Sequence, residues 1–414
     1  MSKKPRNNPK VPDLISNLPS KKPRNNRKVP DLISNLSDHI LLFIISHLSI
    51  KEIVRTSILS KRWTHLWKNV SHFDFELTRM VNADSSRKKK VVTKNDVMKY
   101  AQIVNKTLEQ HKGDLITFES CKKLKILKLD NIFMEEESII NGILKFCFGL
   151  EKFSLINSHG FNSIKIENKS LKSLELIWLD VKEIEVNVEE LQNLVIDSIV
   201  CPPKSLRIYS QNLRSFCSIP KFGSPKSLTT YPQNRPTLLL ICELLIDKKS
   251  RDTLKTQDIL ENCSDLFESQ SINIFQNLLT LSIDLDLNNI REALALSYVL
   301  KTCNHLNTLN ITIQIKKTST FDDCALLFPK SMFWETREID YEFFEKLKFV
   351  TLKGFSGKEQ EVLFAKYLIS RAYMMEKMYV ICDSTIVKEA KDLLSLSKAS
   401  RDLSIVLKKE RKKE

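Results

Sequence analysis

A recurring apolar triplet constrains the fold of this chain more than any other feature of its sequence. The pattern Leu-x-x-Leu-x-Leu begins at Leu124 and returns from Leu150, Leu171 and Leu191, with Phe or Ile at some positions. The central positions of successive copies lie 20 to 26 residues apart. A strand with this pattern can bury its apolar face only when neighbouring copies stack against it. The sequence therefore predicts an array of strand-bearing repeats whose core is made by stacking.

The spacing of the copies is typical of leucine-rich repeats, although the pattern is irregular. Weaker or later copies begin at Leu213, Leu278, Leu306 and Leu347. Where the regular motif has Asn, the chain has Ile132, Ser158 and Leu179. We therefore expect an irregular leucine-rich-repeat solenoid over residues 121–335, without a continuous Asn ladder. Four prolines fall near 218–271, and we expect this interval to be an insert in the array.

Glycine, cysteine and histidine usage excludes several classes of catalytic and metal site. Seven of the 414 residues are glycine, and their spacing rules out G-x-G-x-x-G, the P-loop and G-x-S-x-G. The nine cysteines form no C-x-x-C pair, and the seven histidines show no paired metal-ligand spacing. The sequence therefore predicts a protein that is not an enzyme and that has no catalytic residues, metal or cofactor.

No segment has the length of a membrane span or the pattern of a secretory signal. The longest apolar runs, 40–45 and 238–242, fall far short of the roughly 18 residues that a transmembrane helix needs. Dispersed cysteines without a signal peptide are typical of reduced thiols inside the cell. We therefore expect no membrane partner and an intracellular location, in the nucleus, the cytoplasm or both.

The net charge of +15 is concentrated at the two ends of the chain. Residues 1–30 carry nine Lys/Arg and one Asp, and residues 401–414 carry six Lys/Arg and three Asp/Glu. An 18-residue segment is duplicated in tandem within the first 37 residues, with 16 of its positions identical in both copies. We expect residues 1–35 to be a disordered basic tail. Nuclear import or weak binding to a polyanion is the alternative for this tail.

The pattern becomes helical after the duplicated segment. Four apolar residues fall on one helical face, namely Leu41, Ile44, Ile45 and Leu48. Ser37 is placed to cap this helix, and two shorter helices are expected from about residue 50 and over 61–67. Three such short helices cannot bury all of their apolar side chains among themselves. Part of their surface is therefore expected to meet a partner.

Two segments resemble domains of a known family. The run from Val54 to Trp63, Val-Arg-Thr-Ser-Ile-Leu-Ser-Lys-Arg-Trp, followed by Leu66-Trp67, resembles the F-box of plant F-box proteins. The segment from Leu347 to Gly357, with a helix expected after it from about 358 to 376, resembles the FBD module of plant F-box/leucine-rich-repeat proteins. The resemblance implies an α/β fold in which a three-helix F-box is followed by an irregular leucine-rich-repeat solenoid and an α/β FBD-like cap.

This organisation divides the chain into six expected regions. They are a disordered basic tail at 1–35, the F-box at 36–76, a linker and helix at 77–120, the repeats at 121–335, the FBD-like module at 336–408 and a charged tail at 409–414.

The resemblance also implies which residues contact the Skp-family adaptor that F-boxes bind. These are Leu36, Ile40, Leu41, Ile44, Leu48, Ile53, Val54, Leu59 and Trp63. We expect Ile40, Ile44 and Trp63 to be the anchors of the interface. For each of the nine residues, holding the three helices together is the alternative role.

Three functions follow from these observations. The first is the substrate-recognition subunit of an SCF-type E3 ubiquitin ligase, joined through the adaptor to a cullin scaffold and holding an unknown protein substrate on its repeats. The second is a non-ligase interaction scaffold with a weakened F-box, because the family usually opens the F-box with Leu-Pro where this chain has Leu36-Ser37. The third, which we favour least, is binding of nucleic acid through the basic tails.

Overall fold

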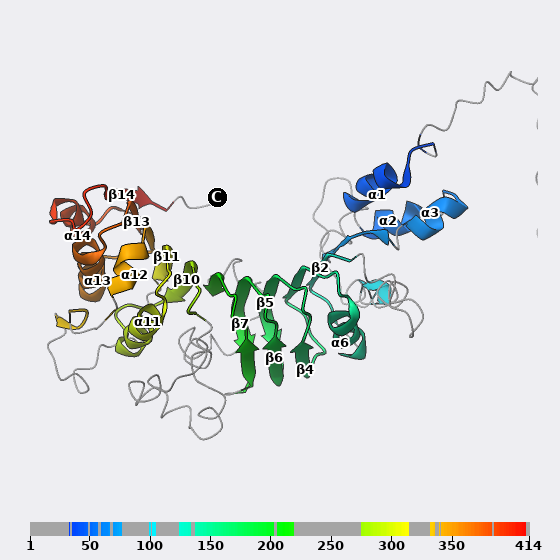
Figure 1. Ribbon diagram of the computed structural model, residues 1–414, viewed down its shortest axis with the longest axis horizontal. Helices are drawn as coiled ribbons and strands as arrows, with labels where there is room; N and C mark the ends of the chain where they lie inside the picture. Colours follow the sequence, from blue (N-terminus) through cyan, green and yellow to red (C-terminus); the bar gives the residue numbers. More distant parts are fainter. Residues whose placement is uncertain are drawn as a thin grey trace, which may run out of the picture.

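The computed structural model describes most of the chain between residues 33 and 410. The described ranges are 33–76, 99–104, 124–218, 275–313, 332–339, 341–382 and 385–410, except for 34, 49, 57–58, 67–68, 101, 134–136, 203–204 and 336–338. Almost all of the tail expected at 1–35, and most of the linker expected at 77–120, lie outside these ranges. Figure 1 shows an elongated arrangement, with a group of short helices at one end and a long sheet running away from it.

Three short helices open the described part of the chain. They are α1 (Asp38–Ser46), α2 (Ile50–Thr56) and α3 (Lys61–Leu66). Arg62 Nε donates to Asp38 Oδ1 at 2.8 Å, and Arg62 Nη2 donates to the Leu36 carbonyl at 2.7 Å. Ser37 occupies the extended N-cap position, but its side chain makes no capping hydrogen bond, contrary to our expectation. The contacts of Arg62, rather than a serine cap, therefore fasten the start of α1 to α3.

The largest element is a sheet of eleven strands, all parallel and arranged in chain order. Its strands are β1 (His72–Glu76), β2 (Ile126–Asp130), β3 (Lys152–Ile156), β5 (Ser173–Asp180), β7 (Asn193–Val200), β9 (Ser215–Ser218), β10 (Thr280–Leu285), β11 (Thr308–Ile313), β12 (Phe349–Lys353), β13 (Lys377–Cys382) and β14 (Ser404–Lys409). We refer to it as the long sheet. The fold class is α/β, as the sequence predicts.

A second layer lies against the long sheet. It contains a parallel three-stranded sheet of β4 (Ser163–Ile166), β6 (Glu183–Asn187) and β8 (Leu206–Tyr209). Its helices are α6 (Glu137–Phe146), α11 (Ile290–Thr302), α12 (Tyr341–Lys346), α13 (Glu359–Arg371) and α14 (Lys388–Asp392), the last followed by the 3-10 turn η5 (Leu393–Ser395). Figure 1 shows α6, the three-stranded sheet and α11 along one side of the long sheet.

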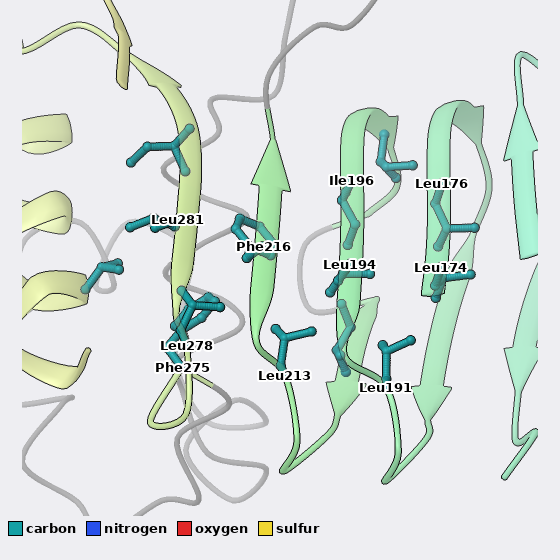
Figure 2. Close-up of a cluster of buried hydrophobic side chains, with 14 of the residues drawn as sticks. Leu174, Leu176, Leu191, Leu194, Ile196, Leu213, Phe216, Phe275, Leu278 and Leu281 are labelled. Carbon is teal, nitrogen blue, oxygen red and sulfur yellow. The ribbon is translucent and has the colours of Figure 1, made fainter. Parts of the chain in front are cut away.

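The apolar triplets of the sequence form the core between these layers. In β2 the triplet residues Leu127 and Leu129 are fully buried, and Leu309 and Ile311 occupy the same places in β11. Figure 2 shows the equivalent side chains of four neighbouring strands stacked in rows. The alternate strand residues point away from the core, and we call the surface that they form the open face.

The strands on either side of residues 219–274 pair directly with each other. β9 and β10 are parallel neighbours, with Phe216 in register with Leu281. The backbone N–H groups of Leu279 and Thr280 both donate to the Arg214 carbonyl, at 2.8 and 3.0 Å. The same doubled contact recurs between other neighbouring repeats. The insert expected near 218–271 lies outside the described residues, apart from Ser218, but its flanks meet as adjacent strands of one sheet.

A left-handed residue lies near the C-terminal end of several strands or directly after it. The φ angles are 59° at Asn131, 45° at Asn157, 53° at Trp178, 50° at Ser198 and 78° at Gly354. The first four positions each follow a residue of one lateral row of the long sheet, and pairing resumes after Trp178 and Ser198. Only Gly, and to a lesser degree Asn, adopt this conformation at little cost. The turn is therefore imposed at Trp178 and Ser198 by the stacking of the repeats and not by local preference.

Ser158 supplies part of what the missing Asn ladder would provide. Its hydroxyl donates to the Ile156 carbonyl at 2.7 Å and accepts from the Ile132 N–H at 3.3 Å. The side chains of Ile132 and Leu179, at the corresponding positions of their repeats, are buried. Neighbouring turns are thus joined by one serine and by apolar packing, where the regular motif uses Asn.

The C-terminal region extends the long sheet. β12, β13 and β14 continue it in parallel register, and the buried apolar side chains of α13 belong to the same apolar core. The helix that we expect from about 358 to 376 ends earlier, at Arg371, because Ala372 takes an extended conformation. None of the helices within the described ranges is long and apolar enough to span a membrane.

Candidate functional site

Helix α1 carries an apolar surface that the described part of the chain leaves exposed. Ile40 is 47% exposed, Phe43 67% and Ile44 40%, while Leu41 and Ile45 on the other side of the helix are completely buried. We call Ile40, Phe43 and Ile44 the α1 surface. Large apolar side chains that cluster and stay exposed are typical of a surface that binds another protein.

The structure divides the nine predicted adaptor contacts into three groups by exposure. Ile40, Ile44 and Leu59 are exposed, Leu36 and Leu48 are half-buried against the core, and Leu41, Ile53 and Trp63 are buried. The side chain of Val54 lies outside the described residues. The sequence left two roles open for each residue, contact with the adaptor or packing between the three helices. The buried residues suit packing, and the exposed residues are available to a partner.

Trp63 differs from what we expect of an interface anchor. Its side chain is 4% exposed and belongs to the same apolar core as Leu41 and Ile45. An indole with so small an exposed fraction offers little surface to a partner. Trp63 therefore fits the alternative role of holding the helices together, and so do Leu41 and Ile53. Interface contacts by Ile40, Ile44 and Leu59 stay a prediction.

Phe43 is the residue that sequence reasoning missed as a candidate contact. Its ring meets the His47 ring edge-on at 4.7 Å between centroids, and the Phe43 carbonyl lies 2.8 Å from His47 Nδ1. These contacts order the exposed ring on the surface of the helix. The signal in the sequence was the run of six apolar residues from 40 to 45, which is too wide for one buried face.

The open face of the long sheet is a second candidate surface, and its charge changes along the strands. Lys128 lies 3.6 Å from Asp74, and Glu175 accepts a hydrogen bond from Ser154 at 2.9 Å. The rows of the open face that begin at Asn193 and Val195 cross β9, β10 and β11 without a charged residue. The first strands thus offer paired charges. The middle strands are neutral along these two rows, and Asp284 of β10 lies on the same face beside them.

Two lysines that we place at the edge of this face hold a common carboxylate. Lys125 Nζ lies 3.5 Å from Glu151 Oε1, and Lys172 Nζ lies 3.6 Å from Glu151 Oε2. Lys172 and then Lys125 lower the pKa of the partly exposed Glu151 carboxyl by their charge. The single carboxylate balances one of the two cations, so the edge formed by these three side chains keeps one positive charge. Within the described ranges, no three His, Cys, Asp or Glu side chains are grouped so as to hold a metal ion.

Two family models match the chain, at its two ends. The F-box domain matches residues 33–75, and the FBD matches residues 343–380. The first range contains all three N-terminal helices and the α1 surface, and the second contains β12, α13 and most of β13.

Curated proteins of Arabidopsis thaliana are similar to this chain. F-box protein At1g80960 is 23% identical over 83% of this chain and 82% of its own length. F-box protein At3g60790 is 25% identical over 40% of this chain and 49% of its own length. The F-box/FBD/LRR-repeat protein At5g53840 is 56% identical over 41 residues, which are 10% of this chain and 9% of that protein. The chain therefore contains an F-box domain and an FBD, and the proteins that it resembles are plant F-box proteins.

Proposed function

We propose that this chain is the substrate-recognition subunit of an SCF-type E3 ubiquitin ligase. Its F-box binds a Skp-family adaptor and through it a cullin scaffold, and its long sheet, as an irregular leucine-rich-repeat solenoid, binds the target protein. The observation that carries the proposal is the α1 surface, an exposed apolar patch within the segment that matches the F-box model.

The α1 surface has the chemistry of an interface centre. Burying a side chain the size of Ile or Phe contributes about 1.5–3 kcal/mol relative to leaving it in water. Three such residues on one turn and a half of helix offer enough apolar area for the centre of a stable interface. The buried Leu41 and Ile45 anchor the same helix from behind, so that the exposed residues are presented on a supported element.

The proposed role is non-catalytic. The subunit holds a target near the enzyme that transfers ubiquitin, and so contributes proximity without making or breaking a bond. The open face suits this role because its side chains point away from the core on eleven adjacent strands. No cofactor is needed for a contribution of this kind.

The test is co-purification of the adaptor with matched variants. We expect the double substitution Ile40→Asp and Ile44→Asp to abolish recovery of the adaptor. Phe148→Asp is the control, because Phe148 is also an exposed apolar residue but lies outside the F-box segment. Circular dichroism of both variants establishes that they are folded. Equal recovery of the adaptor by the double variant and the control would contradict the assignment of the α1 surface.

A non-ligase scaffold is the second candidate, and the start of α1 favours it. Where the family usually has Leu-Pro, this chain has Leu36-Ser37, and the Ser37 side chain makes no capping hydrogen bond. A proline at this N-cap position would fix φ near the −66° that Ser37 adopts, so serine leaves this end of the F-box less constrained. Binding of the adaptor without entry into a cullin complex, measured by size-exclusion chromatography of the reconstituted mixture, would support the scaffold.

A further inference from the structure

The open face of the last three strands carries two lysines arranged around one aromatic ring. Lys408 Nζ lies 4.4 Å from the centroid of the Tyr379 ring, and Lys377 Nζ lies 5.8 Å from it. Tyr379 and Lys377 come from β13, and Lys408 comes from β14 beside it. We call these three residues the lysine–tyrosine patch.

Among the residues that the structure describes, no carboxylate pairs with the two lysines of the patch. The carboxylates nearest to it in the strands are already occupied, since Glu376 pairs with Lys348 at 2.8 Å and Glu410 pairs with Lys353 at 2.7 Å. Neither Lys377 nor Lys408 makes an ion pair within the described ranges. The contacts with the half-buried Tyr379 ring attract the two cations but do not neutralise their charge.

Apolar side chains flank the two cations on the same face. Phe349 is in register with Lys377 on the neighbouring strand and is 38% exposed. Val406 is in register with Tyr379 on the other side and is half-buried. The patch therefore combines two separated positive charges with an apolar floor between them.

We propose that the lysine–tyrosine patch binds an acidic segment of the target protein, with an apolar side chain between its carboxylates. The carboxylates pair with Lys377 and Lys408, and the apolar side chain packs on Tyr379 between Phe349 and Val406. Charge complementarity is the argument for this occupant, because a neutral or basic segment would leave both ammonium groups unpaired beside a bound chain. This inference rests on the proposed function, in which the open face holds the target.

The direct test measures binding of short peptides to the full chain by fluorescence anisotropy. The probe is a labelled peptide with the core Glu-Glu-Phe-Glu-Glu, and the comparison peptide is its neutral analogue Gln-Gln-Phe-Gln-Gln. We expect the acidic peptide to bind and the affinity to fall with added salt. Binding of the neutral analogue with equal affinity, or no binding of the acidic peptide up to about 1 mM, would overturn the proposal.

Charge reversal locates the binding to the patch. We expect the double variant Lys377→Glu and Lys408→Glu to weaken binding of the acidic peptide at least tenfold. The matched control is Lys409→Glu, because Lys409 is an exposed lysine of the same strand that points away from the open face. The double variant should in turn bind the core Lys-Lys-Phe-Lys-Lys, which the wild-type chain does not. An equal loss in the control, or no gain for the basic peptide, would refute the patch as the binding site.

Other polyanions provide the remaining outcomes. We also measure binding of a phosphoserine peptide and of single-stranded oligothymidine. If either binds more tightly than the acidic peptide, the occupant of the patch is not a carboxylate segment and the proposal is overturned. Adaptor recovery is measured on the same protein samples. A double variant that loses the peptide but keeps the adaptor supports the patch, whereas a wild-type chain that binds the peptide but never the adaptor contradicts only the proposed function.

Discussion

Replacing Glu361 by Gln is expected to loosen the connection between α13 and the loop that follows β10. The Glu361 carboxylate is fully buried in the first turn of α13. Its Oε2 accepts from the backbone N–H groups of Ser356 and Gly357, at 2.7 and 3.0 Å, and its Oε1 accepts from the Ser356 hydroxyl at 2.8 Å and from Asn288 Nδ2 at 3.2 Å. One carboxylate thus holds the turn before α13 and the loop that follows β10.

The magnitude follows from the donors that a glutamine cannot satisfy. The side-chain amide of the Glu361→Gln variant has one accepting oxygen, so its NH₂ group must face either the two backbone N–H groups or the Asn288 amide. A buried donor left without an acceptor costs about 1–3 kcal/mol. Because Ser356 and Gly357 are half-buried, water can reach part of the turn. We therefore expect the opening free energy of this region to fall by about 2–3 kcal/mol.

Native-state hydrogen exchange measured by mass spectrometry is the suitable assay, because a repeat chain of this length need not unfold in one step. The readout is the exchange of peptides that span residues 349–382. Glu359→Gln is the control, since it removes an exposed carboxylate from the same helical turn and changes the interaction with the helix dipole in the same way. Equal acceleration of exchange in the two variants would refute the reasoning.

Two further predictions concern buried titratable groups. Burial raises the pKa of the Asp197 carboxyl above its usual value, and its Oδ2 has no hydrogen-bond partner within the described ranges. The contribution of this group to folding stability is therefore greatest below pH 4, where the carboxyl is protonated, and is lost as the pH rises through the raised pKa. Asp197→Asn should therefore stabilise the fold at pH 7 by about 1 kcal/mol and less at pH 4, and a larger gain at pH 4 in urea unfolding would contradict this. Burial also raises the pKa of the Cys303 thiol to about 12, so iodoacetamide should modify Cys303 only in urea, and rapid labelling of the native chain would show that the site is open.

The sequence predicts the strands well because their signal is local and repeated. A triplet such as Leu174-x-Leu176 alternates with the period of a strand, and its recurrence every 20 to 26 residues indicates stacking. The three-stranded sheet was not predicted. Its strands are short, as in Ile164-x-Ile166, and they pair only because the repeats are already stacked. The left-handed turn at Trp178 also depends on the stacking of the repeats, so the local sequence does not predict it.

The candidate site could be predicted as a segment but not as a surface. Residues 40 to 45 are apolar without interruption, so no periodicity distinguishes the buried face of α1 from the exposed one. Packing against α3 decides that Leu41 and Ile45 turn inward and that Ile44 stays outside. The burial of Trp63 depends on the same packing, and a resemblance between sequences carries no information about it.

Parallel stacking in chain order makes the long sheet a spacer of defined length. Neighbouring strands lie about 4.8 Å apart, so β1 and β14 are separated by about 48 Å along the sheet before curvature is considered. The α1 surface adjoins the β1 end, and the lysine–tyrosine patch lies at the other end. Gain or loss of one strand would shift these two surfaces by about 5 Å, whereas substitutions on the open face would leave their separation unchanged. The distance between the two surfaces and the ligand preference of the open face can thus be altered independently in this architecture.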